Sequence, residues 1–345
     1  MMFLPLAPPL GHTTLGSADW GHVLDVVSIG DQLAWEVRPP MNFDHEPVLA
    51  EHVEALFAAE QPATLLDGTL GGAGHAAILL RALPELRLIG IDRDPNARAA
   101  ATERLVPFAE RAEVHEGTYS EFESVLGMLG VSAVDAMFLD LGVSSHQLDT
   151  AERGFSFRAD APLDMRMDPT QGQTAAELIE DADAEQLADI LWRYGEERDS
   201  RRFARAIVKE KPTRTRELAE LIERLTPASR GKTHPATRTF QALRIAVNDE
   251  LGELERWLEA FPSRLNPGGV AAVLTFHSLE DRMVKQRFRE LTQAPARSKY
   301  LPPDDSAIEF ELPFRKALVG SEDEIASNPR ARSAKLRAIR RKGRV

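Results

Sequence analysis

A glycine-rich run at residues 67–75, Asp-Gly-Thr-Leu-Gly-Gly-Ala-Gly-His, lies between a short apolar stretch and a stretch with helical spacing. Glycine lets the backbone turn tightly, and it lets a ligand approach main-chain N–H groups with no Cβ in the way. Asp92 closes the next apolar stretch, where a carboxylate can accept hydrogen bonds from both hydroxyls of a ribose. A packing turn would explain the glycine-rich run alone, and a helix-capping role would explain Asp92 alone. The run and Asp92 together predict a nucleoside-binding site.

The same run leaves two cofactor classes open. Gly72-x-Gly74-x-x-Ala77 loosely matches the dinucleotide fingerprint, so a nicotinamide-dependent dehydrogenase is one alternative. Asp67, which precedes the turn, would repel a pyrophosphate, whereas it suits a ligand that carries a positive charge or an amine. We therefore favour S-adenosylmethionine, whose sulfonium is cationic.

Two further polar clusters follow apolar stretches, at residues 140–149 and 275–281. Ligands of open α/β sheets bind beyond the carboxyl ends of the strands, so Asp140 and Gln147 can contact both cofactor and acceptor. An ordinary exit from strand to loop is the alternative for this cluster. His277 is a candidate catalytic residue for the same positional reason, with a purely structural histidine as the alternative.

The elements that must position these residues alternate between strand and helix patterns, which indicates βαβ units and a parallel sheet. Between about 150 and 248 the pattern is almost entirely helical. We expect a Rossmann-like α/β sheet domain formed by residues 41–149 and 249–345, interrupted by a helical insertion at 150–248. The predicted strands are 64–66, 86–91, 113–115, 133–139 and 270–276, with a candidate edge strand at 310–319; the predicted helices are 47–59, 75–83, 95–105, 175–191, 200–209, 216–225 and 235–247.

Residues 1–40 contain five prolines and four glycines and show no sustained period. Either they form a flexible extension or Met41 is the natural start, which we favour.

Composition excludes several classes of protein. With 43% hydrophobic and 28% charged residues among 345, the chain is typical of a soluble globular protein. It has no cysteine, which excludes disulfides and thiolate metal sites and fits a cytoplasmic location. No apolar run is long enough to cross a bilayer, so we expect no membrane association. His45, Glu46, Glu51 and His52 lack a metal-ligand spacing, so we expect no metal.

The net charge of −12 argues against a nucleic-acid partner, because phosphate contacts need Lys and Arg. Three segments are nevertheless locally basic, namely 193–216, 226–247 and 329–345, and the last contains eight Lys or Arg and no acid. A solvated helix face or tail would explain any one of them. Together they predict an RNA-facing surface that includes Arg238 and Arg244.

The sequence resembles a known family, the small-subunit ribosomal RNA (cytosine-N4) methyltransferase H family. The resemblance covers about 41–335, and Ala73 is its one soft departure, because relatives often carry glycine there. The motifs that carry it are His-Glu-Pro-Val-Leu at 45–49, residues 67–75, Gly-Ile-Asp-Arg-Asp at 90–94, Leu-Asp-Leu-Gly-Val-Ser-Ser at 139–145, Arg-Gly-Phe-Ser-Phe at 153–157, Leu-Asp-Met-Arg-Met-Asp at 163–168, Tyr-Gly-Glu-Glu at 194–197, residues 234–242, residues 276–281 and Asn-Pro-Arg-Ala-Arg-Ser at 328–333.

The resemblance implies a class I methyltransferase sheet whose inserted helical domain recognises RNA. It also implies methylation of the exocyclic amine of one cytosine in the decoding region of 16S rRNA, within the small ribosomal subunit and not on DNA, and it leaves a homodimer open. Carried over residue by residue, it places the following residues at the S-adenosylmethionine site: Ala73, Gly74 and His75 on the turn, Asp92 on the ribose, Tyr119 on the adenine, and Asp140 with Gln147 completing the pocket.

The chemistry needs in-line alignment of the cytosine N4, the methyl group and the sulfur. Asp140, the main-chain carbonyls of 141–144 and His277 are candidates to accept the N4 protons. Phe155 and Phe157 could stack on a splayed base, and as core residues they are equally well explained. A non-catalytic RNA-binding factor and a DNA or small-molecule methyltransferase remain as alternatives to the rRNA enzyme.

Overall fold

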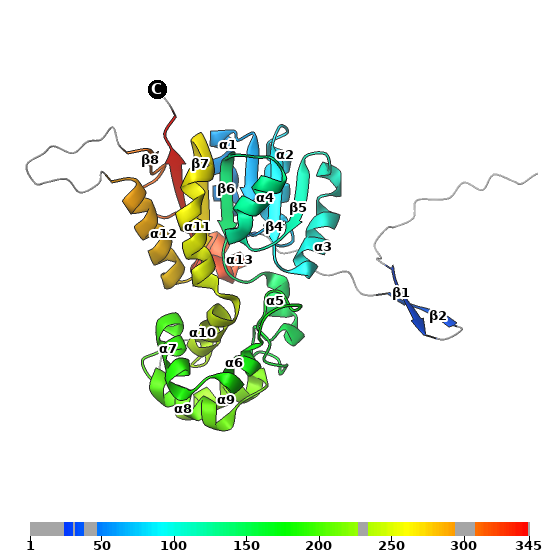
Figure 1. Cartoon of the computed structure of the whole chain (residues 1–345), viewed down its shortest axis with the longest axis vertical. Helices are drawn as coiled ribbons and strands as arrows, with labels where there is room; N and C mark the ends of the chain where they lie inside the picture. The colour runs from blue at the N-terminus through cyan, green and yellow to red at the C-terminus, as the bar shows by residue number, and fades with distance from the viewer. Residues whose placement is uncertain (1–23, 30–31, 38–46, 227–233, 294–307, 344–345) are drawn as a thin grey trace, which may run out of the picture. The chain divides into compact units, whose positions relative to one another are not determined.

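The computed structural model describes residues 24–29, 32–37, 47–226, 234–293 and 308–343, and the chain divides into two compact units, Met1–Asn42 and Phe43–Val345 (Figure 1). In the first unit, β1 (Leu24–Ile29) pairs antiparallel with β2 (Gln32–Val37). The sequence pattern did not predict these two strands. Two six-residue runs are too short to show a sustained period, yet they satisfy each other's backbone hydrogen bonds as a pair.

The second unit contains, within its described residues, a seven-stranded sheet of order β5-β4-β3-β6-β7-β9-β8. Its strands are β3 (Thr64–Asp67), β4 (Arg87–Asp92), β5 (Ala112–Glu116), β6 (Val134–Asp140), β7 (Leu265–Thr275), β8 (Phe310–Glu311) and β9 (Lys335–Arg341). Strands β3 to β7 are parallel, and β9 and β8 are antiparallel at one edge. The predicted Rossmann-like class I methyltransferase sheet is therefore confirmed, and its order reverses at β3, which has β4 on one side and β6 on the other.

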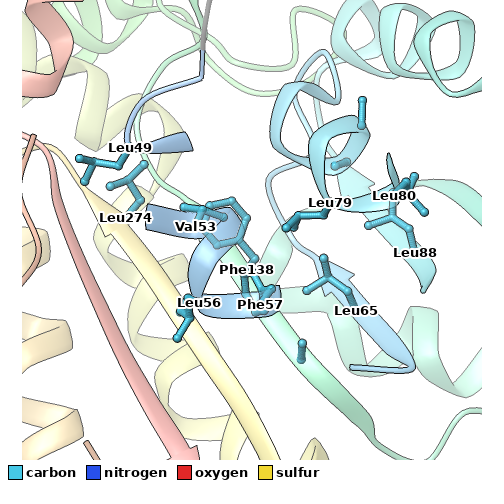
Figure 2. Packing of buried hydrophobic residues seen from close by; sticks show 14 of the residues in the cluster. Leu49, Val53, Leu56, Phe57, Leu65, Leu79, Leu80, Leu88, Phe138 and Leu274 are labelled. Carbon is cyan, nitrogen blue, oxygen red and sulfur yellow. The ribbon is translucent and has the colours of Figure 1, made fainter. Parts of the chain in front are cut away.

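Helices cover both faces of this sheet (Figure 1). One layer contains α1 (Ala50–Glu60), α2 (Gly74–Ala82) and α3 (Pro95–Arg104), and the other contains α4 (Phe122–Met128), α11 (Glu250–Arg264) and α12 (Ser278–Leu291). Successive residues of β6 alternate between them, because Phe138 packs in the first layer and Leu139 in the second. In Figure 2, Phe57 of α1 meets Phe138 edge-on, with ring centroids 6.0 Å apart. Because helices bury both faces of the sheet, a ligand can reach the strands only at their ends.

The segment between β6 and β7 forms a group of helices with its own apolar core. Its helices are α6 (Ala175–Asp181), α7 (Ala184–Gly195), α8 (Ser200–Glu210), α9 (Thr215–Leu225) and α10 (Thr237–Asn248), preceded by the short α5 (Ser145–Asp149). The single helix predicted at 175–191 is two helices, because Asp183 accepts hydrogen bonds from the N–H groups of Glu185 and Gln186, both at 2.8 Å, and so starts α7.

The C-terminal part departs from expectation. The candidate edge strand at 310–319 is only the two residues of β8, and the segment interpreted as a basic tail contains β9, which pairs with β7 over six residues. Leu336, Ala338 and Ile339 are buried, so this basic segment still has an apolar side for the sheet. No helix in the described part of the chain is long and apolar enough to cross a membrane.

Candidate functional site

A cavity of about 350 Å³ opens beyond the carboxyl ends of β3, β4, β6 and β7. A cavity of this size at the point where the strand order reverses is typical of a small-molecule site. Six of the predicted site residues line it, namely Gly74, His75, Asp92, Tyr119, Asp140 and Gln147, whereas Ala73 and His277 are not part of its wall.

The glycine-rich turn after β3 lies against the end of β4. The N–H of Gly71 donates to Asp92 Oδ2 at 2.7 Å. Gly68 has to lack a side chain, because a Cβ there would lie 2.6 Å from Leu139 Cδ2. Ala73 has φ 58 and is fully buried where α2 begins, so it shapes the turn rather than contacting the cavity.

Asp92 accepts hydrogen bonds from main-chain N–H groups. Its neighbour Asp94 links the segment after β4 to side chains that follow β6. Asp92 Oδ1 accepts from the N–H of Asp94 at 2.8 Å, and burial raises the pKa of Asp92 to about 6. Asp94 Oδ2 accepts from both Gln147 Nε2 and Arg153 Nη1 at 2.9 Å. Gln147 Oε1 accepts from the N–H of Ser144 at 2.9 Å, so this side chain braces the cavity wall. Sequence reasoning gave Asp94 and Arg153 no role, because their pairing depends on the fold.

Asp67, Asp140 and His75 form a buried titratable cluster. Burial raises the pKa of Asp67 to about 7 and that of Asp140 to about 8, and the charge of Asp67 adds to the effect on Asp140. His75 Nε2 lies 3.6 Å from Asp140 Oδ2, and burial lowers the pKa of His75 to about 4, so the imidazole is neutral at pH 7. Asp140 Oδ1 is buried without a hydrogen-bond partner among the described residues. A cation in the cavity would stabilise the ionised carboxyls.

The half-buried ring of Tyr119 forms part of the cavity wall. It lies next to the glycine-rich turn, since a Cβ added to Gly68 would be 2.8 Å from the Cβ of Tyr119. Its hydroxyl donates to the carbonyl of Glu250 at 3.0 Å, and burial raises its pKa well above the ordinary value. The ring is thus fixed in the cavity wall, and its contact with an adenine stays a prediction from the resemblance.

Another part of the cavity wall contains charged residues that sequence reasoning missed as site residues. Arg244 of α10 donates to both carboxylate oxygens of Glu250, at 2.8 and 2.7 Å. Glu280 accepts from the N–H of Phe276 at 2.8 Å, and His277 Nε2 lies 3.1 Å from its other oxygen. Burial would raise the pKa of Glu280, but the hydrogen bond and charge of His277, with Arg244, hold it below the ordinary value. His277 therefore faces Glu280.

Glu250, His277 and Glu280 place ligand atoms within 4.8 Å of one another, a distance that a metal ion could bridge. Sequence spacing did not reveal this cluster, because Glu250 belongs to α11 whereas His277 and Glu280 lie at the start of α12. The cationic Arg244 already engages both oxygens of Glu250, and a second cation there would be repelled. We place no metal at this cluster.

The structure changes the interpretation of the basic segments. Arg244 is largely buried in its ion pair with Glu250, so the expectation that it lies on an RNA-facing surface was wrong. Arg238 is exposed and donates to the carbonyl of Glu196 at 3.2 Å. In β9, Arg337 pairs with Asp281 at 2.7 Å, so this segment is partly neutralised within the fold.

Phe155 and Phe157 lie in the core of the helical group. Phe155 is 7% exposed, and the ring of Phe157 packs on His234 and Phe240, with centroids 4.4 and 4.9 Å away. The structure therefore favours the core interpretation over the stacking one.

Comparisons with known proteins show which family the chain belongs to. The model of the MraW methylase family matches residues 42–342. The ribosomal RNA small subunit methyltransferase H of Anaeromyxobacter sp. (strain K) is 50% identical over 310 residues, which is 86% of this chain and 98% of the relative. The protein of the same name from Geobacter sulfurreducens is 50% identical over 307 residues, 86% of this chain and 99% of the relative. A solved rRNA methylase from Streptococcus thermophilus, at 12% identity and a TM-score of 0.36 over 86% of this chain and 97% of its own, is too distant to carry an argument. The chain belongs to the MraW methylase family.

Proposed function

We propose that this chain transfers a methyl group from S-adenosylmethionine to the exocyclic N4 amine of a cytosine in the 16S rRNA of the small ribosomal subunit. The observation that carries the proposal is the cavity where the strand order reverses, which joins a glycine-rich turn to the carboxyls of Asp67, Asp92 and Asp140. Relatives that match 86% of the chain are named as small-subunit ribosomal RNA methyltransferases, which supports the rRNA substrate. The sequence motifs supply the expectation of cytosine N4.

The residues present fit S-adenosylmethionine. Each oxygen of Asp92 accepts one main-chain hydrogen bond, which leaves each a free lone pair for a ribose hydroxyl. Tyr119 can pack on the adenine, and Gly74 and His75 present the start of α2. The carboxyls of Asp67 and Asp140 suit a cationic sulfonium. They would repel the pyrophosphate of a nicotinamide dinucleotide, so the dehydrogenase alternative fits poorly.

The mechanism asks this chain to align the cytosine and accept a proton. Cytosine N4 is a weak nucleophile because its lone pair is shared with the ring, so alignment provides much of the acceleration. S-adenosylmethionine supplies an electrophilic methyl group. Asp140 lines the cavity with an unpartnered Oδ1, and a nearby positive charge favours its ionised form, which can accept an N4 proton. The main-chain carbonyls of 141–144 can accept from the other N4 hydrogen. His277 faces Glu280 and is assigned to positioning.

The helical group of α6 to α10 gives the RNA a second surface, in line with an RNA-recognition domain at 150–248. Arg201 and Arg205 lie one turn apart on α8, and both are exposed. Basic side chains at this spacing can track a phosphate backbone. The chain's net charge of −12 thus does not exclude RNA.

The test measures labelled methyl transfer into free 16S rRNA and into assembled small subunits, followed by nucleoside analysis. We expect N4-methylcytosine in at least one substrate. Its absence from both, with active cofactor binding, would refute the proposal. Binding of S-adenosylmethionine and of NAD, measured by calorimetry, separates the two cofactor classes.

The matched pair Asp92→Asn and Glu85→Gln tests the site. Each substitution removes one carboxylate, but Glu85 is exposed and lies outside the cavity. Asp92→Asn is expected to weaken S-adenosylmethionine binding by about 100-fold, because it loses charge-assisted hydrogen bonds to the ribose. Glu85→Gln is expected to bind as the unsubstituted protein does. Full methyl transfer by Asp92→Asn protein would instead favour a different cofactor site.

A further inference from the structure

One arginine of the cavity wall has no role in the chemistry derived above. Arg330 belongs to a short 3-10 segment, Pro329–Arg332, near the C-terminal end of the described chain, within the motif Asn-Pro-Arg-Ala-Arg-Ser. Its guanidinium Nη1 donates to the hydroxyl of Ser145, which begins α5 directly after the loop beyond β6. The fold therefore brings two segments 185 residues apart together at the cavity.

Arg330 differs from other arginines of the cavity in its partners. Arg93 lies 3.5 Å from a carboxylate oxygen of Glu253, and Arg244 lies 2.7 Å from Glu250. Among the described residues, no carboxylate oxygen lies within the 4.0 Å of an ion pair with Arg330. Burial lowers the pKa of Arg330, and the more distant charges of Asp149 and Asp140 offset this only in part. A half-buried guanidinium without an anionic partner is costly unless a ligand supplies the anion.

The position of Arg330 indicates which ligand supplies it. In the proposed function Asp140 faces the cytosine amine, and Ser145, the partner of Arg330, follows the loop that carries Asp140; exposed Ser333 also lines the cavity. The cofactor side has a guanidinium of its own, Arg104, whose Nη1 would lie 3.8 Å from a Cβ on Gly74. A nucleotide that enters with its amine toward Asp140 brings a phosphate with it, and a guanidinium matches the geometry of phosphate oxygens.

We propose that Arg330, oriented by Ser145, binds a backbone phosphate of the nucleotide that is methylated. This inference rests on the proposed function and adds a substrate-positioning residue to it. The contact holds the sugar–phosphate backbone while Asp140 and the carbonyls of 141–144 face the amine. This contact depends on the shape and charge of the phosphate, so it carries no information about which base is present.

The experiment compares Arg330→Ala and Arg330→Lys with the control Arg332→Ala. Arg332 lies two residues away, is exposed and does not line the cavity, so the control removes the same charge from the same segment. Binding to small ribosomal subunits is measured over a range of KCl concentrations, S-adenosylmethionine affinity is measured separately, and thermal unfolding checks the fold.

We expect Arg330→Ala to weaken subunit binding about 10-fold or more and to reduce the salt slope by about 1, as for one lost phosphate contact. Arg330→Lys should restore the slope but only part of the methylation rate, because lysine keeps the charge without the planar fork. S-adenosylmethionine affinity should stay within 2-fold of the unsubstituted protein. Arg332→Ala should change little.

An unchanged salt slope with weaker binding would mean that Arg330 contacts the base, and lost S-adenosylmethionine affinity would mean that it holds the cofactor's carboxylate. Either result overturns the inference, as does an equal effect of Arg332→Ala. Failure of the unsubstituted protein to methylate either free 16S rRNA or small subunits would refute the proposed function itself. Normal methylation and binding by Arg330→Ala protein would refute this inference alone.

Discussion

Asp140 is held in the cavity as an acid whose ionisation opposes folding, so its replacement should stabilise the protein while removing activity. Burial raises its pKa from 3.8 to about 8. Because the folded protein retains a proton that the unfolded chain releases above pH 4, stability present at low pH is lost as the pH rises through about 8. Asp140→Asn has no proton to release and escapes this loss.

The magnitude follows from the size of the pKa change. One pKa unit corresponds to about 1.4 kcal/mol, so a rise from 3.8 to about 8 corresponds to about 5–6 kcal/mol at most. Since 29% of the Asp140 side chain is open to the cavity, water screens the charge, and we expect less than half of this. The free energy of unfolding of Asp140→Asn minus that of the unsubstituted protein should therefore grow by about 2 kcal/mol between pH 5 and pH 8.

The assay is urea unfolding of the cofactor-free protein at pH 5 and pH 8 at one ionic strength. Glu85→Gln, an exposed substitution, serves as the control and should follow the unsubstituted protein at both values. Methyl transfer by Asp140→Asn should fall by about 100-fold or more if the carboxylate accepts the N4 proton. A stability difference that is the same at both pH values, or that shrinks at pH 8, would refute the argument that ionisation of Asp140 is costly.

Three further predictions concern the scaffold, each measured by urea unfolding. Gly68→Ala should destabilise the protein by about 1–3 kcal/mol and weaken S-adenosylmethionine binding, because the new Cβ would lie 2.6 Å from Leu139 Cδ2; unaltered stability would contradict the packing argument. Gly127→Ala, in α4 with no atom within 4 Å of the new Cβ, should instead stabilise it by about 0.5–1 kcal/mol, and a loss would show hidden crowding. Arg153→Met should cost about 3–5 kcal/mol because it leaves Asp94 as a buried charge, whereas a cost below about 1 kcal/mol would mean that Gln147 alone satisfies that carboxylate.

Much of the sheet domain could be predicted from local pattern. The apolar runs that end in Asp67, Asp92 and Asp140 are strands whose carboxyl ends face one cavity, as parallel βαβ order requires. Hydrophobic period and turn chemistry act over a few residues, so they can be recognised without the fold. The sequence pattern missed the short strands β1 and β2, which show no sustained period. It also missed the cap at Asp183, which divides a helical stretch into two helices.

Charge was the least reliable guide, because the meaning of a charged residue depends on its partner. Arg244 reads as part of a basic surface in the sequence, yet in the fold it neutralises Glu250 inside the cavity. The C-terminal basic segment reads as a tail, yet β9 needs only three buried apolar residues to join the sheet, and Arg337 finds Asp281 there.

The sequence by itself determined the βαβ units of the sheet, the glycine-rich turn and the types of side chain available for a methyl-transfer site. Only the tertiary structure decided which groups meet: Asp94 with Gln147 and Arg153, and Arg330 with Ser145. The physical reason is that ion pairing, burial and the resulting pKa shifts depend on distances of a few ångströms between segments far apart in the chain. Packing of the two helix layers and the helical group fixes those distances.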